Sequence, residues 1–207
     1  MANILVFIEQ RDGKIKRSSL EALSKAAELG GTMGMDAVAV LIGSGVGSAA
    51  AELGKYGAKK VFVFDHPSLA SYASTAYARL VTKVAKEEGT AVVLMGATAM
   101  GKDLAPRVAV RLGAGLASDC VELNSDGGKL IARRYAYSGK VVATVTIETG
   151  VKVFSLRPNV FAVNGNYGFA GEVVSSAYDP EPGDLKSVVK EIVASAGAEC
   201  RGRRTLT

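Results

Sequence analysis

Apolar residues in the first half of the chain recur with two different spacings that alternate along the sequence. Short continuous apolar runs, which are typical of strands buried on both faces, lie at residues 4–8, 36–42, 60–64 and 91–95. Between these runs apolar residues return at helical spacing, which predicts helices over residues 18–29, 46–56 and 71–88. We expect Gly30-Gly31 to end the first of these helices. Strands that alternate with helices predict a mostly parallel sheet with helices on both faces, because parallel neighbours need crossover connections.

After Gly113 the pattern changes to β-branched runs without helices between them. Strands are predicted over residues 118–123, 130–137, 141–148 and 151–155. Turn sequences at residues 124–128 and 138–139 separate them, so we expect these strands to complete the sheet as an antiparallel extension. Farther along, Asp184 to Ala194 fits a helix with Asp184 as its N-cap, and it also fits a β-rich edge strand.

Length and charge narrow the class of protein. A chain of 207 residues with ordinary composition can bury the core of one large domain or of two small ones. Its net charge of +5 comes largely from residues 11–17 and from Arg201, Arg203 and Arg204, which we expect in a loop and in the tail. The chain has no Trp and no basic stripe mixed with aromatic residues, so nucleic-acid binding is not expected. No apolar segment nears the roughly 20 residues that cross a bilayer, and the chain opens directly on a strand, which favours the bacterial cytoplasm over membrane insertion.

Residues suited to catalysis or to metal binding are few. Cys120 and Cys200 lie far apart and neither has a second cysteine nearby, so no metal site or redox pair is expected, and we interpret Cys120 as a buried thiol. His66 is the only histidine and precedes Pro67, which favours an exposed turn residue over a general base. The chain is therefore predicted to contain no catalytic residues.

Two glycine-rich turns follow predicted strands and are the candidates for ligand binding. The first covers residues 43–48 and resembles a dinucleotide-binding turn, with Asp65 at the end of the next strand in the place of the acid that holds a ribose. Gly43 and Gly45 would let the backbone approach such a cofactor. The spacing of the glycines and the position after the second strand favour instead a flexible loop between strand and helix.

The second glycine-rich turn connects the strand at 91–95 to a helix that is predicted to continue from Lys102. Such a turn places backbone N–H groups and the positive end of a helix dipole at the carboxyl edge of the sheet, where anions and nucleotides bind. The candidate ligand-binding residues here are Gly96, Gly101, Lys102 and Asp103, together with Asp119 in the strand that follows.

Charged residues near the second turn also fit structural roles. Asp103 suits the first turn of a helix and an ion pair with Arg107 four residues later. Arg133, Arg134 and Arg157 lie on or beside the late strands, and we expect them at solvated strand edges or in salt bridges at a subunit surface.

Four stretches together identify a family. Residues 96–109, 118–120, 133–139 and 151–158 closely resemble, in order and spacing, the amino-terminal half of the electron transfer flavoprotein alpha subunit. The resemblance runs through nearly the whole chain. It implies one subunit of a heterodimer that accepts electrons from dehydrogenases, such as acyl-CoA dehydrogenases of fatty acid beta-oxidation, into FAD. The electrons then pass to a membrane quinone oxidoreductase or another respiratory-chain acceptor.

The same resemblance implies how the work is divided within the protein. In the family, FAD is held chiefly by a carboxyl-terminal domain that opens with a Ser-Gly-Gly-Arg-Gly-like phosphate loop, and no such motif occurs in this sequence. The amino-terminal domain is three-layered αβα, similar to the adenine-nucleotide alpha hydrolase group, and pairs with a beta subunit that carries AMP. Residues 1–197 would form this domain, with a strand over 186–194, and residues 198–207 would start the linker to the missing FAD-binding domain. The alternative is a stand-alone nucleotide-binding α/β module that uses one of the glycine turns.

Overall fold

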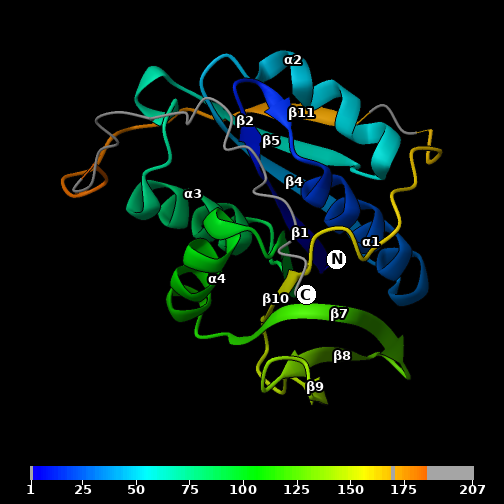
Figure 1. The fold of residues 1–207 in the computed structure, drawn as a ribbon. Helices are drawn as coiled ribbons and strands as arrows, with labels where there is room; N and C mark the ends of the chain where they lie inside the picture. Colours follow the sequence, from blue (N-terminus) through cyan, green and yellow to red (C-terminus); the bar gives the residue numbers. More distant parts are fainter. Residues whose placement is uncertain (1, 169–170, 186–207) are drawn as a thin grey trace, which may run out of the picture.

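The structure is a computed structural model that describes residues 2–168 and 171–185 (Figure 1). Its strands are β1 (Asn3–Ile8), β2 (Gln10–Arg11), β3 (Lys14–Ile15), β4 (Asp36–Gly43), β5 (Lys60–Asp65), β6 (Val92–Gly96), β7 (Gly115–Asp126), β8 (Lys129–Ala136), β9 (Val141–Thr146), β10 (Lys152–Leu156) and β11 (Glu172–Ser175). Its helices are α1 (Arg17–Met33), α2 (Gly47–Ala50), α3 (Ser74–Glu87) and α4 (Ala99–Leu112), with short 3₁₀ turns η1 (Ala51–Tyr56) and η2 (Pro67–Leu69).

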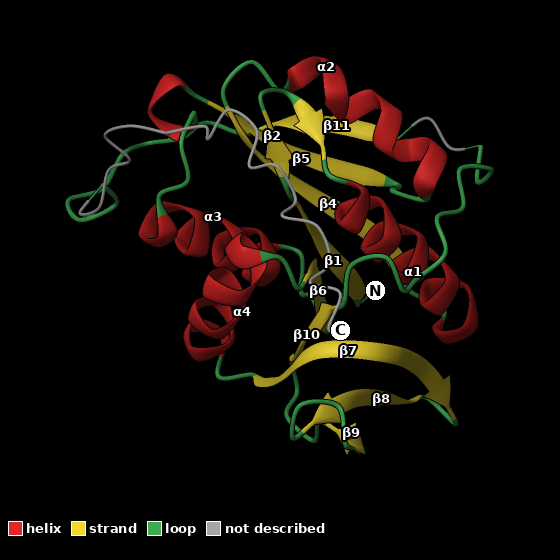
Figure 2. Ribbon diagram, viewed as in Figure 1, coloured by secondary structure: helices red, strands yellow, loops and turns green. Residues whose placement is uncertain are grey.

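Nine of the described strands form one sheet in the order β11-β5-β4-β1-β6-β10-β7-β8-β9, and β2 and β3 form a separate hairpin. From β11 to β7 every neighbouring pair is parallel, whereas β8 and β9 are added in antiparallel fashion. Helices α1 and α2 cover one face of the sheet, and α3 and α4 cover the other (Figure 2). The predicted three-layer α/β fold with an antiparallel extension is confirmed.

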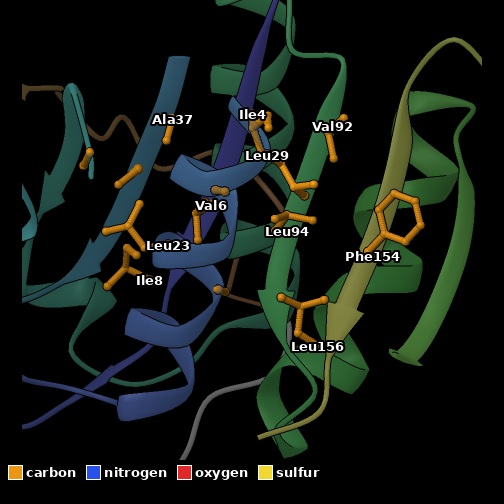
Figure 3. Packing of buried hydrophobic residues seen from close by; sticks show 14 of the residues in the cluster. Ile4, Val6, Ile8, Leu23, Leu29, Ala37, Val92, Leu94, Phe154 and Leu156 are labelled. Carbon is orange, nitrogen blue, oxygen red and sulfur yellow. The ribbon is translucent and has the colours of Figure 1, made fainter. Parts of the chain in front are cut away.

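The central strand β1 shows why this arrangement is stable. Its alternate residues Ile4, Val6 and Ile8 pack against α1, where Leu23 and Leu29 meet them (Figure 3). The residues between them face the core beneath α3 and α4. Because successive side chains of a strand point to opposite faces, a strand buried on both sides must be apolar throughout, which is the pattern the sequence shows.

The structure places the strand predicted at 151–155 in a different part of the sheet. The run at 151–155 was expected in the antiparallel extension, but β10 lies parallel between β6 and β7. Val153, Phe154 and Leu156 are almost completely buried there. An apolar β-branched run predicts a strand, but it does not specify which neighbour the strand will pair with.

Several helix boundaries also differ from the prediction. Gly30-Gly31 do not end α1, which continues to Met33 and stops at Gly34 in left-handed backbone (φ 66°). A Cβ on Gly30 would lie 2.4 Å from the carbonyl oxygen of Met35, so this glycine permits close packing rather than a stop. The helix expected over 46–56 is one turn of α2 followed by the 3₁₀ turn η1, and α3 begins at Ser74 rather than Ser71.

The hairpin β2–β3 and the strand β11 were not predicted, because strands of two and four residues are too short to show a periodic pattern. The segment 186–194, for which a strand was favoured, and the proposed linker 198–207 lie outside the described residues.

Candidate functional site

The first glycine turn is held by an internal carboxylate. The side chain of Asp65 accepts hydrogen bonds from the backbone N–H groups of Gly45 (2.7 Å), Val46 (3.0 Å) and Gly47 (3.2 Å). Gly43 allows close packing, because a Cβ there would lie 2.5 Å from Nε2 of Gln10. Asp65, the candidate for a ribose contact, therefore binds the turn itself. An external anion would have to displace the carboxylate of Asp65 to reach these N–H groups.

The second glycine turn is shaped by close backbone contacts. Thr98 caps α4: its hydroxyl oxygen accepts from the N–H of Gly101 at 3.0 Å, and its hydroxyl donates to the carboxylate of Glu9. A Cβ on Gly101 would lie 1.9 Å from the carbonyl oxygen of Gly96, and one on Gly96 would lie 2.9 Å from the Cβ of Ser18. These two glycines are thus required for the turn to pack, whether or not a ligand binds beside it.

The carboxylate of Asp103 is occupied by its own surroundings. It accepts from Nε and Nη2 of Arg107 at 3.0–3.1 Å, as the spacing predicted, and from the hydroxyl of Tyr72 at 2.8 Å. The hydrogen bonds from Arg107 are the largest cause that holds the pKa of Asp103 below its ordinary value. Burial, followed by the bond to Asp103, raises the pKa of Tyr72.

Asp119 lies at the carboxyl edge of the sheet, where β7 bulges against β10. Its backbone is left-handed (φ 59°), and its carboxylate binds Nε (3.2 Å) and Nη2 (2.6 Å) of Arg157. These hydrogen bonds are the largest cause that lowers the pKa of Asp119, and the nearby charges of Lys102 and Arg134 lower it further. Three cationic groups therefore act on one carboxylate.

A cavity of about 750 Å³ opens beside this cluster, with Asp119, Arg134, Tyr135 and Arg157 among its lining residues. The guanidinium of Arg157 lies 4.9 Å from the centre of the Tyr135 ring. Nε of Arg134 is buried and has no hydrogen-bond partner within the described residues. A buried donor without a partner is rare and costly. Because Arg134 and Arg157 both line this cavity, it is suited to a ligand group that carries negative charge.

The three arginines of the late strands have different roles. Arg157 pairs with Asp119, and Arg133 pairs with Glu122 at 3.0 Å, as expected for salt bridges. Arg134 is partly buried, and within the described residues its Nε has no hydrogen-bond partner, so a salt bridge across a subunit surface stays a prediction for this residue. The alternation of a strand could have revealed this burial, because Arg134 shares a face with Leu130 and Ala132, and both of those are buried.

The remaining candidates have structural environments. Nδ1 of His66 accepts from the N–H of Ser68 at 3.2 Å, and its ring lies 5.2 Å from that of Tyr178. Cys120 is buried, and burial raises the pKa of its thiol to about 11. Within the described residues, no three His, Cys, Asp or Glu side chains gather in a way that could hold a metal ion. In the same part of the chain, no helix has the length and apolar character needed to span a membrane.

The family model and the sequence relatives indicate one family. The electron transfer flavoprotein domain matches residues 4–192. The electron transfer flavoprotein alpha subunit of Thermoanaerobacterium thermosaccharolyticum is 35% identical over 198 residues, which are 94% of this chain and 60% of that protein. The acryloyl-CoA reductase electron transfer subunit beta of Anaerotignum propionicum is 44% identical over 129 residues, or 62% of this chain and 35% of that protein.

Among solved structures, the universal stress protein from Archaeoglobus fulgidus in complex with dAMP aligns with a TM-score of 0.35 at 16% identity, covering 50% of this chain and 89% of that chain. Likeness at this level carries no argument about a ligand. The alpha subunit of Bacillus subtilis is 35% identical over 192 residues, 92% of this chain and 58% of that protein. The chain thus spans about 60% of the length of the alpha subunits that it matches, and it belongs to the electron transfer flavoprotein family.

Proposed function

We propose that this chain is the amino-terminal scaffold of an electron transfer flavoprotein alpha subunit. It pairs with a beta subunit, which carries AMP, and it supports a separate FAD-binding domain that follows residue 197. The assembled protein is an electron carrier rather than an enzyme. It takes electrons from dehydrogenases such as acyl-CoA dehydrogenases in the bacterial cytoplasm, and it delivers them to a respiratory-chain acceptor.

The observation that carries this proposal is the extent of the match. Similarity covers nearly all of this chain but only about 60% of each alpha subunit, so the relatives have a further part with no counterpart here. The sequence also lacks a Ser-Gly-Gly-Arg-Gly-like phosphate loop. Both facts favour a scaffold role in which FAD is bound mainly elsewhere in the protein.

The cavity at Arg134 supports a contact between this domain and an anionic group of FAD. The presence of Arg134 and Arg157 in its lining and the surplus of positive charge around Asp119 both fit such a group. When bound, FAD supplies the electron-carrying chemistry. Arg134 would donate to the anionic group, Arg157 would add positive charge, and Asp119 would hold the guanidinium of Arg157 in position through two hydrogen bonds.

The alternative, a stand-alone nucleotide-binding module, has less support. The turn at residues 43–48 already binds the carboxylate of Asp65 through three N–H groups. The turn at Gly96 and Gly101 still presents the start of α4 at the carboxyl edge of the sheet, where a phosphate could bind.

Co-purification with a beta subunit distinguishes the scaffold role from the stand-alone nucleotide-binding module. The chain is produced together with a beta subunit from the same organism, its mass is measured by light scattering, and acid-released nucleotides are identified. The scaffold role predicts a complex of one chain with one beta subunit and no flavin held by this chain alone. A lone chain that retains an adenine nucleotide and ignores the beta subunit would support the module instead.

The contact with FAD has its own test in a complex that includes an FAD-binding domain. We expect Arg134→Gln to speed the release of FAD, measured by the recovery of flavin fluorescence. Arg133→Gln, one residue away but paired with Glu122, serves as the matched control. Equal release rates in the two variants would remove Arg134 from the cofactor site.

A further inference from the structure

The segment that follows β10 is attached to α1 before it reaches the far edge of the sheet. Residues 157–168 run along α1 on their way from β10 to β11 (Figure 1). The N–H of Asn159 donates to the carboxylate of Glu21 at 2.9 Å, and the N–H of Asn164 donates to Oγ of Ser24 at 3.0 Å. The first of these attachments lies just beyond Arg157, which lines the cavity beside Asp119.

Glu21 is a charged residue on the buried side of α1. It is only 1% exposed. Its cationic partner Arg17, at 3.2 Å, has a side chain that is 72% exposed, so this ion pair contributes little to stability. A buried carboxylate is costly unless it is also hydrogen-bonded. The bond from Asn159 therefore connects a costly buried charge to the chain immediately after Arg157.

The backbone of Arg157 is restrained on both sides. Its own N–H donates to the carbonyl of Cys120 in β7 at 2.9 Å. The next residue is Pro158, which disfavours helical backbone at Arg157. Asn159 then adopts left-handed backbone (φ 62°), which Asn tolerates better than most residues, and Glu21 binds its N–H. These restraints limit the positions from which the guanidinium of Arg157 can reach the cavity.

The backbone of Asp119 is restrained by a second buried polar side chain. Asp119 lies where the register of β7 against β10 shifts, and its backbone is left-handed. A residue at such a bulge leaves the regular ladder, so its N–H needs another acceptor. Oγ of Ser155 in β10 accepts from this N–H at 3.0 Å, and Ser155 is completely buried.

We infer that Glu21 and Ser155 are positioning residues for this cavity, which hold the backbones of Arg157 and Asp119 so that their ion pair has one arrangement before an anionic group binds. The role toward FAD rests on the proposed function. In the described part of the chain neither Glu21 nor Ser155 lines the cavity, so each acts through another residue. A guanidinium that is already ordered loses less conformational freedom when a ligand binds.

The pKa of Asp119, followed by NMR in the chain alone, tests the positioning without a cofactor. The hydrogen bonds from Arg157 lower this pKa most, and the charges of Lys102 and Arg134 lower it further. Glu21→Leu removes the acceptor of the Asn159 N–H, and because Asn159 is exposed, water can replace it and the chain should fold. We expect the pKa of Asp119 to rise toward its ordinary value as the contact with Arg157 loosens. Loss of the negative charge of Glu21 could by itself only lower this pKa.

Three further variants complete this measurement. Glu21→Gln keeps an oxygen that can accept from Asn159, and Arg17→Met removes only the exposed partner of Glu21. We expect no rise in the pKa of Asp119 in either. Ser155→Ala removes the acceptor on the other side of the ion pair and should raise this pKa as Glu21→Leu does. It supplies the same test if Glu21→Leu does not fold.

The affinity for FAD, measured by flavin fluorescence in a complex that includes an FAD-binding domain and a beta subunit, tests the role of the positioning. We expect Glu21→Leu to weaken FAD binding by about two- to tenfold. In a chain that already carries Arg157→Gln, the same substitution should have no further effect, because Glu21 acts through Arg157.

Three outcomes would overturn the inference in different ways. If neither Glu21→Leu nor Ser155→Ala raises the pKa of Asp119, these residues do not position the pair, although the proposed function stands. If Glu21→Leu weakens FAD binding equally with and without Arg157→Gln, Glu21 supports the fold in general rather than Arg157. If Arg157→Gln itself leaves the affinity for FAD unchanged, the proposed contact with FAD fails, and the role of Glu21 and Ser155 toward FAD fails with it.

Discussion

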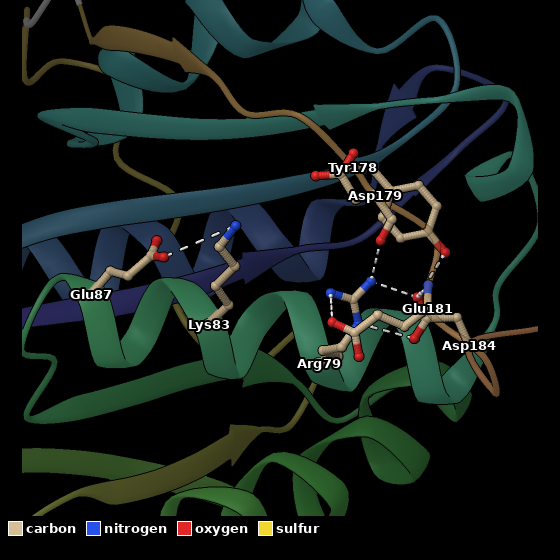
Figure 4. A network of polar contacts seen from close by, with 7 residues as sticks. All are labelled: Arg79, Lys83, Glu87, Tyr178, Asp179, Glu181 and Asp184. Atoms are coloured by element: carbon tan, nitrogen blue, oxygen red, sulfur yellow. Dashed lines mark hydrogen bonds and ion pairs between the residues drawn. The ribbon is translucent and has the colours of Figure 1, made fainter.

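Replacement of Arg79 by Met should destabilise the fold strongly, because one guanidinium holds the last described segment to α3 (Figure 4). Nε and Nη2 of Arg79 donate to the two carboxylate oxygens of Asp184, at 3.0 and 2.5 Å. Arg79 also donates to the carboxylate of Glu181 and to the carbonyl of Asp179, both at 2.9 Å. Asp184 is only 3% exposed and accepts further bonds from the hydroxyl of Tyr178 and the N–H of Glu181.

The size of the effect follows from this burial. Hydrogen bonds to a charged partner contribute about 1.5–3 kcal/mol, and the loss is larger when a buried carboxylate is left without its cation. The bond to Glu181 adds little, since that side chain is 60% exposed. We therefore expect Arg79→Met to lower the free energy of unfolding by about 3 kcal/mol, which is roughly 6–12 °C in Tm for a domain of this size.

Lys83→Met is the matched control, one turn farther along the same helix. Lys83 reaches Glu87 at 4.0 Å with both side chains about half exposed, so its loss should cost about 0.5 kcal/mol or less. Urea unfolding followed by circular dichroism measures both variants. If Arg79→Met is no less stable than Lys83→Met, the reasoning about the buried carboxylate is wrong.

The effect should also depend on pH. Burial alone raises the pKa of Asp184, but the hydrogen bonds from Arg79, the Glu181 N–H and Tyr178 outweigh it and hold this pKa below its ordinary value. A carboxylate whose pKa is lower in the folded state stabilises the fold at any pH above its unfolded value, near 3.9, and this stabilisation is lost as the pH falls through the folded value. The difference between Arg79→Met and the unsubstituted chain should be full at pH 7 and shrink below about pH 4.

Three further substitutions or reactions test individual contacts. Asp65→Ala should cost about 1–2 kcal/mol in urea unfolding, because three N–H groups of the first glycine turn lose their acceptor; no loss would mean that the turn does not depend on this carboxylate. Gly101→Ala should cost about 3 kcal/mol, since its Cβ would overlap the carbonyl of Gly96, whereas Gly31→Ala in α1 meets nothing within 4 Å and should be neutral or stabilising in the same assay. In a Cys200→Ser background, Cys120 should react with a thiol reagent only at the rate of global opening, because the thiol is buried and its pKa is raised to about 11; rapid labelling of the native protein would contradict this.

The elements of the parallel sheet were predictable because each is decided by its own residues. A short apolar run such as that of β1 favours a strand covered on both faces because it is too short for a buried helix, and the helices between such runs show the spacing of one buried face. Pairing is decided by contacts between distant segments, so the place of β10 between β6 and β7 was not predictable from its composition. The role of Gly30 in α1 was not predictable for the same reason. Whether this glycine ends the helix or permits close packing depends on how closely the backbone at Met35 approaches it.

The candidate site was only partly accessible from the sequence. Spacing alone predicted the pair of Asp103 with Arg107, because both lie on one helix. The pairing of Asp119 with Arg157 depends on the parallel contact of β7 with β10. That Nε of Arg134 lacks a partner among the described residues likewise depends on how distant segments pack around it. Binding of Asp65 to the first glycine turn joins two loops that follow neighbouring strands, and no local pattern distinguishes it from a contact with a ribose.

The most direct test of the scaffold proposal is the intact mass of this polypeptide in its source cells, with the absorbance of bound flavin recorded on the purified protein. The proposal predicts a product much heavier than 21.4 kDa that carries FAD. A native product of 21.4 kDa that carries no flavin would contradict it, and the stand-alone module would become the better explanation.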